Sequence, residues 1–305
     1  ATLRFDGDRG EWRVTSVLSA SNLNQETAGY IQDGKAAYKR DSARRVNRNP
    51  EAYRDASSVR AYVKFARELG TQTLTITPYL RSNSMVFLQH YLPWQSRESN
   101  EHDSIGVQAS LSSVTDWGSY ITGIDIDVTE GELTEDQADA FSPNQPAGIH
   151  YDYRVDATNA ALFGQIEVAL SETVSLQAGL RSETSDYDYK TRAPAGSVCA
   201  AEASNCRFYR PENRSDDFSN LSGNLSLIWA QGDHRYYVRT ALGFRAPQAT
   251  ELYRLQAGQA VADIDSEEAQ SIDLGWRYQR GDFSSDVSVY SISKDEVMFQ
   301  GRGRQ

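Results

Sequence analysis

The stretch Val59-Arg60-Ala61-Tyr62-Val63-Lys64-Phe65 alternates strictly between apolar residues and longer polar or amphipathic ones. Successive side chains of a β-strand point to opposite faces, so its four apolar residues share one face. A short polar turn follows at Leu69–Thr71, and the segment Leu74–Leu80 repeats the alternation. Helical spacing fits neither segment as well. The region therefore predicts two strands joined by a tight turn.

The same period of two recurs along the chain. It is clear at Leu162–Leu170, Val174–Leu180, Leu221–Trp229, Tyr236–Phe244 and Ile272–Tyr278. We predict twelve strands, from Ala1–Phe5 to one that ends near Lys294. Most of them are expected to be about ten to twelve residues long, which suits a tilted crossing of a membrane.

Connection length supports a membrane barrel, because short and long connections alternate along the chain. An up-and-down barrel places all short turns at one end and all long loops at the other, as outer-membrane barrels do. Soluble β-sandwiches have no reason to sort loops in this way. We therefore predict an all-β, antiparallel, transmembrane up-and-down barrel. The short turns are expected near Asp6–Gly10, Leu69–Thr71, Thr115–Gly118, Ser171–Thr173, Gln231–His234 and Gly281–Asp282, and the long loops at Asn22–Ser57, Ser84–His102, Glu130–Asp156, Tyr187–Asp217 and Ala246–Ser266.

Composition alone allows a soluble protein as well as a barrel. The 305 residues are 39% hydrophobic and carry a net charge of -11, and no apolar run is long enough for a membrane helix. A barrel keeps its mean hydropathy low because lipid-facing and lumen-facing residues alternate. The negative charge, with no basic stripe, argues against nucleic acid as a partner. The charged residues expected to face the lumen are Arg60, Lys64, Arg181, Glu183, Arg235, Arg239, Arg277, Asp125, Asp127 and Asp273.

Aromatic residues collect near the predicted strand ends, where an outer-membrane barrel carries interfacial girdles. The alternative is that strands simply favour aromatic residues. The residues concerned are Trp12, Trp117, Tyr120, Trp229, Phe244 and Phe283.

The two cysteines, Cys199 and Cys206, lie in one polar segment without a histidine or further cysteine at metal-site spacing. They are predicted to form a local disulfide, which would place that loop in an oxidising compartment. Free thiols are the alternative.

The sequence does not favour catalysis or a metal site. His102-Asp103-Ser104 is similar to the His-x-Ser element of outer-membrane phospholipases. However, Ile105 and the alternate residues after it would form the lipid face, so His102 and Ser104 would point into the lumen or the loop. The acidic run Thr129–Asp139 lacks the ligand spacing of a calcium loop and is expected to be a solvated loop. We expect neither enzymatic activity nor a cofactor.

The run Gly243-Phe244-Arg245-Ala246-Pro247-Gln248-Ala249-Thr250-Glu251-Leu252-Tyr253 resembles the Phe-Arg-Ala-Pro…Glu-Leu-Tyr motif of TonB-dependent receptor barrels. The acidic segment Asp263–Glu268 before a strand and the segment Asn22–Asp55 also look like parts of such receptors. The resemblance covers essentially the whole chain. Within the motif, Phe244, Arg245, Pro247, Glu251 and Tyr253 are expected to be structural, with Pro247 ending a strand because it cannot donate to the ladder.

Family membership would imply a barrel of about 22 strands closed by an N-terminal plug. Residues 1–305 would then be a partial barrel domain, cut at both ends and without its plug. The resemblance implies a receptor in the bacterial outer membrane, in contact with its lipid, that imports a scarce nutrient with energy from TonB. A ferric siderophore is the expected ligand. A passive pore and a surface-binding barrel are the alternatives.

Anionic iron chelates are held by arginines and aromatic faces, so residues of these kinds on the predicted loops are candidate ligand contacts. For each of them the alternative is a solvated loop residue. The candidates are Arg44, Arg45, Arg48, Tyr53, His90, Tyr91, Trp94, Arg97, His150, Tyr151, Tyr153, Arg207, Tyr209 and Arg210.

Overall fold

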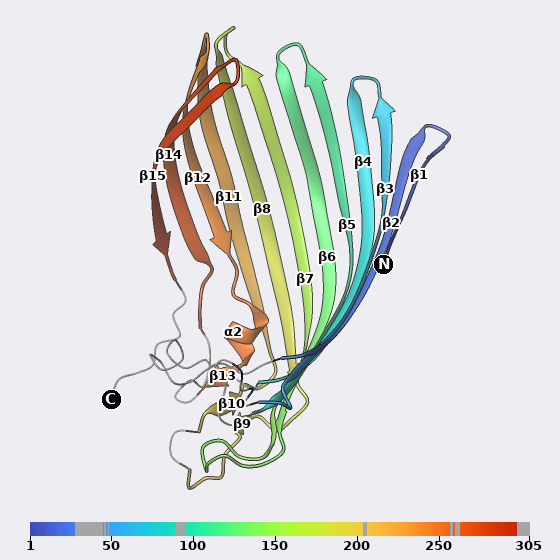
Figure 1. Cartoon of the computed structure of the whole chain (residues 1–305), viewed down its shortest axis with the longest axis vertical. Coiled ribbons are helices and arrows are strands. Elements are labelled where there is room, and N and C mark those ends of the chain that lie inside the picture. Colours follow the sequence, from blue (N-terminus) through green and yellow to red (C-terminus); the bar gives the residue numbers. More distant parts are fainter. Residues whose placement is uncertain are drawn as a thin grey trace.

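Twelve antiparallel strands form one curved sheet in the computed structural model, and a small assembly of loop elements lies at one end of it (Figure 1). The structure describes residues 1–27, 45, 47, 49–89, 95–203, 206–256, 259 and 263–297. Each strand pairs with the next strand of the sheet along the chain, which confirms the predicted all-β, up-and-down arrangement. In order across the sheet the strands are β1 (Thr2–Arg9), β2 (Trp12–Glu26), β3 (Tyr53–Leu69), β4 (Gln72–Leu88), β5 (Arg97–Thr115), β6 (Gly118–Gln137), β7 (Gly148–Ala169), β8 (Val174–Thr191), β11 (Arg214–Gln231), β12 (His234–Arg245), β14 (Glu267–Arg280) and β15 (Phe283–Asp295).

The remaining elements belong to the two connections that follow β8 and β12. Strands β9 (Gly196–Ser197), β10 (Phe208–Arg210) and β13 (Leu255–Gln256) form a second, three-stranded sheet in the order β13-β10-β9. Helix α2 (Ala249–Tyr253) precedes β13. Among the described residues, no helix is long and apolar enough to cross a membrane.

The short turns all lie at one end of the sheet, here called the turn end, and the long connections lie at the loop end (Figure 1). Arg9 pairs with Trp12, and Leu69 pairs with Gln72, so only two residues separate these strands. Gly10 and Gly70 adopt φ angles of 61° and 67° in those turns. Tight hairpin turns need such left-handed residues, and glycine adopts them without a steric penalty.

The strands are longer than the sequence pattern predicts, and the loops are correspondingly shorter. Strands β6 and β7 contain 20 and 22 residues, whereas about ten to twelve were expected. The predicted loop Glu130–Asp156 is reduced to residues 138–147 between paired strand residues. The cause is that backbone hydrogen bonds extend the ladder beyond the segment in which apolar residues alternate.

The two faces of the sheet differ as predicted. Lys64, Asp125, Arg181 and Arg239 border one shared cavity, and we call their side the inward face. Arg181 of β8 bonds Asp125 of β6, across the intervening strand β7, at 2.6 Å. The opposite, outward face carries exposed apolar side chains, including Ile105 and Leu162 at 67% and 61% exposure. The structure therefore segregates charge from apolar surface across a single layer.

Aromatic residues form a band at the turn end. Trp229 stacks on Tyr236 with ring centroids 5.2 Å apart, and Trp117 stacks on Tyr120 at 6.4 Å. Phe283 contacts Tyr278 in the same region. Of the six aromatic residues predicted at strand ends, Phe244 alone lies at the loop end, next to the last residue of β12.

Candidate functional site

At the loop end, elements of two connections pack against the inward face of the sheet. Helix α2 and strands β10 and β13 supply Leu252, Tyr253, Leu255 and Phe208 to a buried apolar cluster. The wall strands β6, β7 and β8 supply the other members of the cluster, which are Leu133, Tyr151, Tyr153, Val155 and Tyr189. Burial of these large side chains provides the main driving force for folding the connections inward.

Arg254 anchors the end of α2 to the wall through two carboxylates. Its guanidinium lies 2.9 Å from Oε2 of Glu98 and also bonds Oε2 of Glu135. Glu98 and Glu135 are 6% and 1% exposed, so both are buried charges. A buried carboxylate is tolerated only when it is paired and hydrogen-bonded. The pairing therefore ties the β12–β14 connection to β5 and β6.

His150 extends this polar network. The register between β6 and β7 shifts at Glu135 and Asp136, which leaves His150 without a partner in the ladder. A bulge of this kind redirects a side chain. Nδ1 of His150 lies 3.1 Å from Glu135, and Nε2 lies 2.8 Å from the carbonyl of Pro146.

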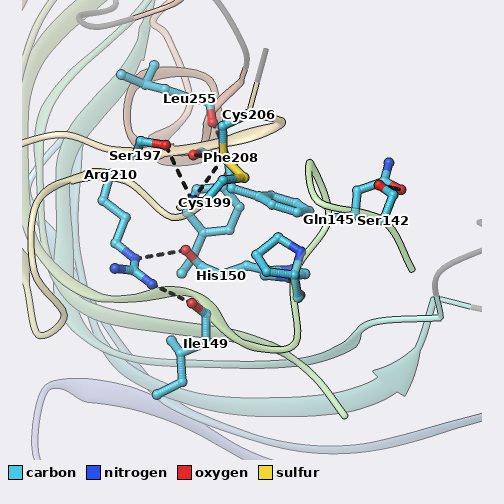
Figure 2. Close-up of a disulfide and its surroundings, with 12 residues drawn as sticks. Ser142, Gln145, Ile149, His150, Ser197, Cys199, Cys206, Phe208, Arg210 and Leu255 are labelled. Atoms are coloured by element: carbon cyan, nitrogen blue, oxygen red, sulfur yellow. Dashed lines mark hydrogen bonds between the residues drawn. A yellow bond between two sulfur atoms is a disulfide. The ribbon is translucent and has the colours of Figure 1, made fainter. Parts of the chain in front are cut away.

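Arg210 holds the other connection, the one that follows β8, to the same strand. Its guanidinium donates to the carbonyls of His150, at 2.9 Å, and Ile149 (Figure 2). It also donates to the carbonyl of Pro194 at 2.9 Å. The ring of Phe208 stacks on His150 with centroids 3.7 Å apart. Arg210 thus satisfies backbone acceptors that its own loop buries.

The two cysteines are joined in a disulfide beside this contact, with Cα atoms 5.6 Å apart (Figure 2). The backbone N–H of Cys199 points to Sγ of Cys206, 3.2 Å away. The cross-link closes the segment between β9 and β10, so it restrains the short sheet that faces α2.

The motif run forms the corner between β12 and α2. Arg245 pairs with both oxygens of Glu251, at 2.9 and 3.0 Å, and with Glu267 at 2.9 Å. The Gln248 N–H donates to Glu251 at 2.7 Å, which satisfies a donor of the first helical turn. The hydroxyl of Tyr253 donates to Asp216 of β11 at 2.8 Å. These contacts join β12, α2, β14 and β11 at the corner.

The pKa values of three ionisable groups at this end of the sheet are shifted toward the protonation states that their contacts require. Burial raises the pKa of Glu251, but hydrogen bonds from Arg245 and Gln248 outweigh it and hold the pKa below its usual value. Burial, together with the bond to Asp216, raises the pKa of the Tyr253 hydroxyl. Burial works against the charge of Arg254, yet Glu135 and Glu98 raise its pKa above the usual value.

A cavity of about 450 Å³ lies between the inward face and the start of α2. Its walls come from β5, β6, β7 and β8 and from residues 248–250. Leu133, Tyr153 and Val155 contribute apolar surface from the buried cluster, and His102 lies at its border. The cavity is the best candidate for a ligand site at this end of the sheet.

Several predicted contact residues do not lie on exposed loops. His150, Tyr151 and Arg210 are buried, and protein groups already satisfy them; the Tyr151 hydroxyl, for example, donates to the Leu255 carbonyl at 2.5 Å. Strand β7 begins at Gly148, so His150 and Tyr151 are wall residues. We correct their assignment, and that of Arg210, to anchoring the connections.

The other predicted contacts are dispersed. Tyr153 is buried but borders the cavity. Arg97 faces outward beside Asp136, 3.7 Å away, and Tyr209 packs against the apolar cluster. Tyr53 begins β3, and the backbone N–H of Arg207 donates to the Asn144 carbonyl. Arg44, Arg48, His90, Tyr91 and Trp94 lie outside the described residues, and Arg45 is an exposed residue at the border of that region.

The acidic run Thr129–Asp139 was expected to be a solvated loop, and this expectation is wrong for most of it. Strand β6 continues to Gln137, and Glu135 within it is buried against Arg254. The local sequence does not indicate this burial, because a carboxylate in a polar stretch is usually solvated. Arg254 directly follows Tyr253, the last residue of the motif, and this position is the sequence feature that points to its role. Within the described part of the chain, no three His, Cys, Asp or Glu side chains are arranged to hold a metal ion.

Residues 1–304 match the family described as TonB dependent receptor-like, beta-barrel. No curated protein matches the chain. Solved structures, in contrast, resemble it over nearly its whole length. The ferric yersiniabactin uptake receptor FyuA from Yersinia pestis is 13% identical with a TM-score of 0.70, covering 95% of this chain and 44% of that one.

Two further solved structures are transporters named for other ligands. The ferric-catecholate import receptor Fiu from E. coli K12, in its closed form, is 10% identical with a TM-score of 0.66, covering 92% of this chain and 48% of that one. The copper transporter OprC is 13% identical with a TM-score of 0.67, covering 95% and 44%. At these identities the likeness concerns the fold. The chain spans less than half the length of these three proteins.

Proposed function

The chain belongs to the TonB-dependent receptor family of β-barrels, and we propose that it forms part of an active-transport receptor of the bacterial outer membrane. In this proposal the loop end captures a scarce nutrient. The complete protein then imports the nutrient through the barrel with energy supplied by TonB. The proposed ligand is a ferric siderophore or a similar metal chelate.

The observation that carries the proposal is the family match combined with the folding of two connections onto the inward face. An apolar outward face suits lipid, and a charged inward face suits a wet or plugged lumen. Connections packed on the inward face border a cavity at the loop end. Solved structures with this fold include iron and copper transporters, which supports a metal chelate as the ligand class.

Contacts outside the cavity are also part of the proposal. Tyr53, Arg97, Arg207 and Tyr209 lie near the loop end and remain candidate ligand contacts. The same holds for Arg44, Arg48, His90 and Trp94, which lie outside the described residues.

Uptake measurements test the transport proposal. The full-length receptor is expressed in a bacterial strain that has an outer membrane but lacks its own chelate receptors. Radioactive iron is supplied to the cells as ferric chelates. We expect uptake that saturates with concentration and stops when an uncoupler collapses the inner-membrane proton gradient. Uptake that rises linearly with concentration and survives the uncoupler would instead identify a passive pore.

A further inference from the structure

The cavity under α2 has the size and position of a ligand site. Its volume of about 450 Å³ falls within the range of small-molecule pockets, roughly 300–1,000 Å³. It opens on the inward face at the loop end, between strands β5 to β8 and residues 248–250. A ligand that entered the mouth would meet this cavity before it reached the deeper inward face.

The described side chains that line the cavity are apolar or aromatic over much of its wall. Leu133 and Val155 are 5% exposed, and Tyr187 packs beside them against the same cluster. None of the described residues that line it is a lysine or an arginine. The surface therefore favours a ligand with an apolar or aromatic body.

Tyr153 is the candidate hydrogen-bonding residue of the cavity wall. The residue is 3% exposed, and its ring lies against Tyr189 and Tyr253, with centroids 5.3 and 6.5 Å away. Within the described part of the chain, no group bonds its hydroxyl. Because Tyr153 borders the cavity, its hydroxyl is available to donate or accept a hydrogen bond from a bound molecule. His102 and Tyr187 border the same cavity and add further polar groups to its wall.

The charges near the cavity argue against an anionic ligand. Glu98, Glu101 and Glu132 line it, and Arg254 is the guanidinium that neutralises Glu98. Arg254 is shared with Glu135, so two buried carboxylates engage one cation. No positive charge is left over for a ligand carboxylate or catecholate, which would enter a low-dielectric site without a counter-ion.

We infer that this cavity binds a neutral or cationic chelate with an apolar body, which accepts or donates a hydrogen bond at Tyr153. The inference rests on the proposed transport function and names the ligand class that the same site selects. It departs from the sequence-based expectation that arginines hold an anionic chelate.

Matched chelates and matched variants test the inference in the full-length receptor. The probes are one linear ferric trihydroxamate in three forms: with a free terminal amine and one positive charge, acetylated and neutral, or succinylated with one negative charge. Binding is measured by titration calorimetry in detergent, and uptake in cells. Ala157→Phe fills the cavity from the inward face of β7, whereas Ala160→Phe adds the same ring on the outward face of that strand. Tyr153→Phe removes only the hydroxyl.

We expect the succinylated chelate to bind at least about tenfold more weakly than the other two, because burying an unpaired charge is costly. Ala157→Phe should abolish binding, and Ala160→Phe should leave it unchanged. Tyr153→Phe should weaken binding about three- to tenfold, the usual effect of one hydrogen bond. Its melting temperature should not fall, since the protein itself does not use the hydroxyl.

The results separate the two proposals. Equal binding of all three chelates, binding that survives Ala157→Phe, or no binding of any chelate overturns the inferred site. If energy-dependent iron uptake persists in those cases, the transport function stands without it. Binding that follows the expected pattern without any uptake supports the site and contradicts the transport proposal.

Discussion

Arg245 joins three parts of the loop end through one side chain. It lies at the end of β12, bonds both oxygens of Glu251 in α2, and bonds Glu267 at the start of β14. A guanidinium can make this two-pronged contact because its donors are planar and fixed, whereas a lysine offers only a point charge. The corner therefore depends on the identity of the cation as well as on its charge.

The lowered pKa of Glu251 predicts how the corner responds to acid. Since its folded-state pKa lies below the ordinary carboxyl value, the charged form stabilises the folded corner. That stability is complete above the ordinary value and is lost as the pH falls through the lowered one. We expect amide exchange in Ala249–Tyr253, corrected for intrinsic rates, to quicken roughly fivefold over this window, corresponding to about 1 kcal/mol. Glu251→Gln should already exchange quickly at neutral pH and show little further change; parallel curves for both proteins would refute the assignment.

Sequence reasoning at the residue scale succeeded for the disulfide, whose two cysteines lie close along the chain. Cys199 and Cys206 are seven positions apart. Arg254 and Glu135 are 119 positions apart, and nothing in either segment indicates that they meet. Such a contact arises from the fold of the sheet and from the path of a connection across it, so it could not be predicted from local pattern.

At the scale of elements, α2 and β13 are held to the wall by a network that is both polar and apolar. Leu252 and Leu255 bury their side chains, and Arg254 between them pairs with Glu98 and Glu135. An exposed charge pair stabilises the folded protein only slightly. Removing one partner of a buried pair is costly, because the other charge is left buried without a counter-ion. The network is therefore more sensitive to removal of Arg254 than its contact distances alone suggest.

Arg254→Met is expected to release this connection from the wall. It leaves Glu98 and Glu135 without their cation, at a cost of about 3 kcal/mol. Amide exchange at Leu252, Tyr253 and Leu255 should accelerate by about a hundredfold or more. Adding Glu135→Gln to the variant removes one of the two stranded charges and should restore part of the protection. Unchanged exchange in Arg254→Met would show that the apolar cluster alone holds α2.

Period two located the strands of the main sheet but not their ends. In β7, apolar residues alternate around Leu162, while the segment from His150 to Val155 places aromatic and polar residues on the inward face. The inward residues of this segment are buried because the connections cover them. In this segment the inward face is therefore the apolar one, whereas elsewhere in the sheet the outward face is apolar. The small elements β9, β10 and β13 are two or three residues long and give no periodic signal.

For the whole molecule, the sheet presents a lipid-compatible outward face, with an aromatic band at the turn end and a charged inward face behind it. The sequence predicted this division because it follows from the alternation in every strand. The same division supplies a test of membrane orientation, since neighbouring positions on one strand should tolerate charge very differently.

Leu162 and Gln165 lie three residues apart in β7, on opposite faces. Leu162 is exposed outward and pairs with Ile124, whereas Gln165 borders the large inward cavity with Arg181. Leu162→Arg should destabilise the full-length receptor by about 2–4 kcal/mol, the cost of arginine near the middle of a bilayer. Gln165→Arg adds the same side chain to a wet face and should change the stability by less than about 1 kcal/mol. Reversible urea unfolding from lipid vesicles measures both, and equal losses in the two variants would mean that the outward face does not meet lipid.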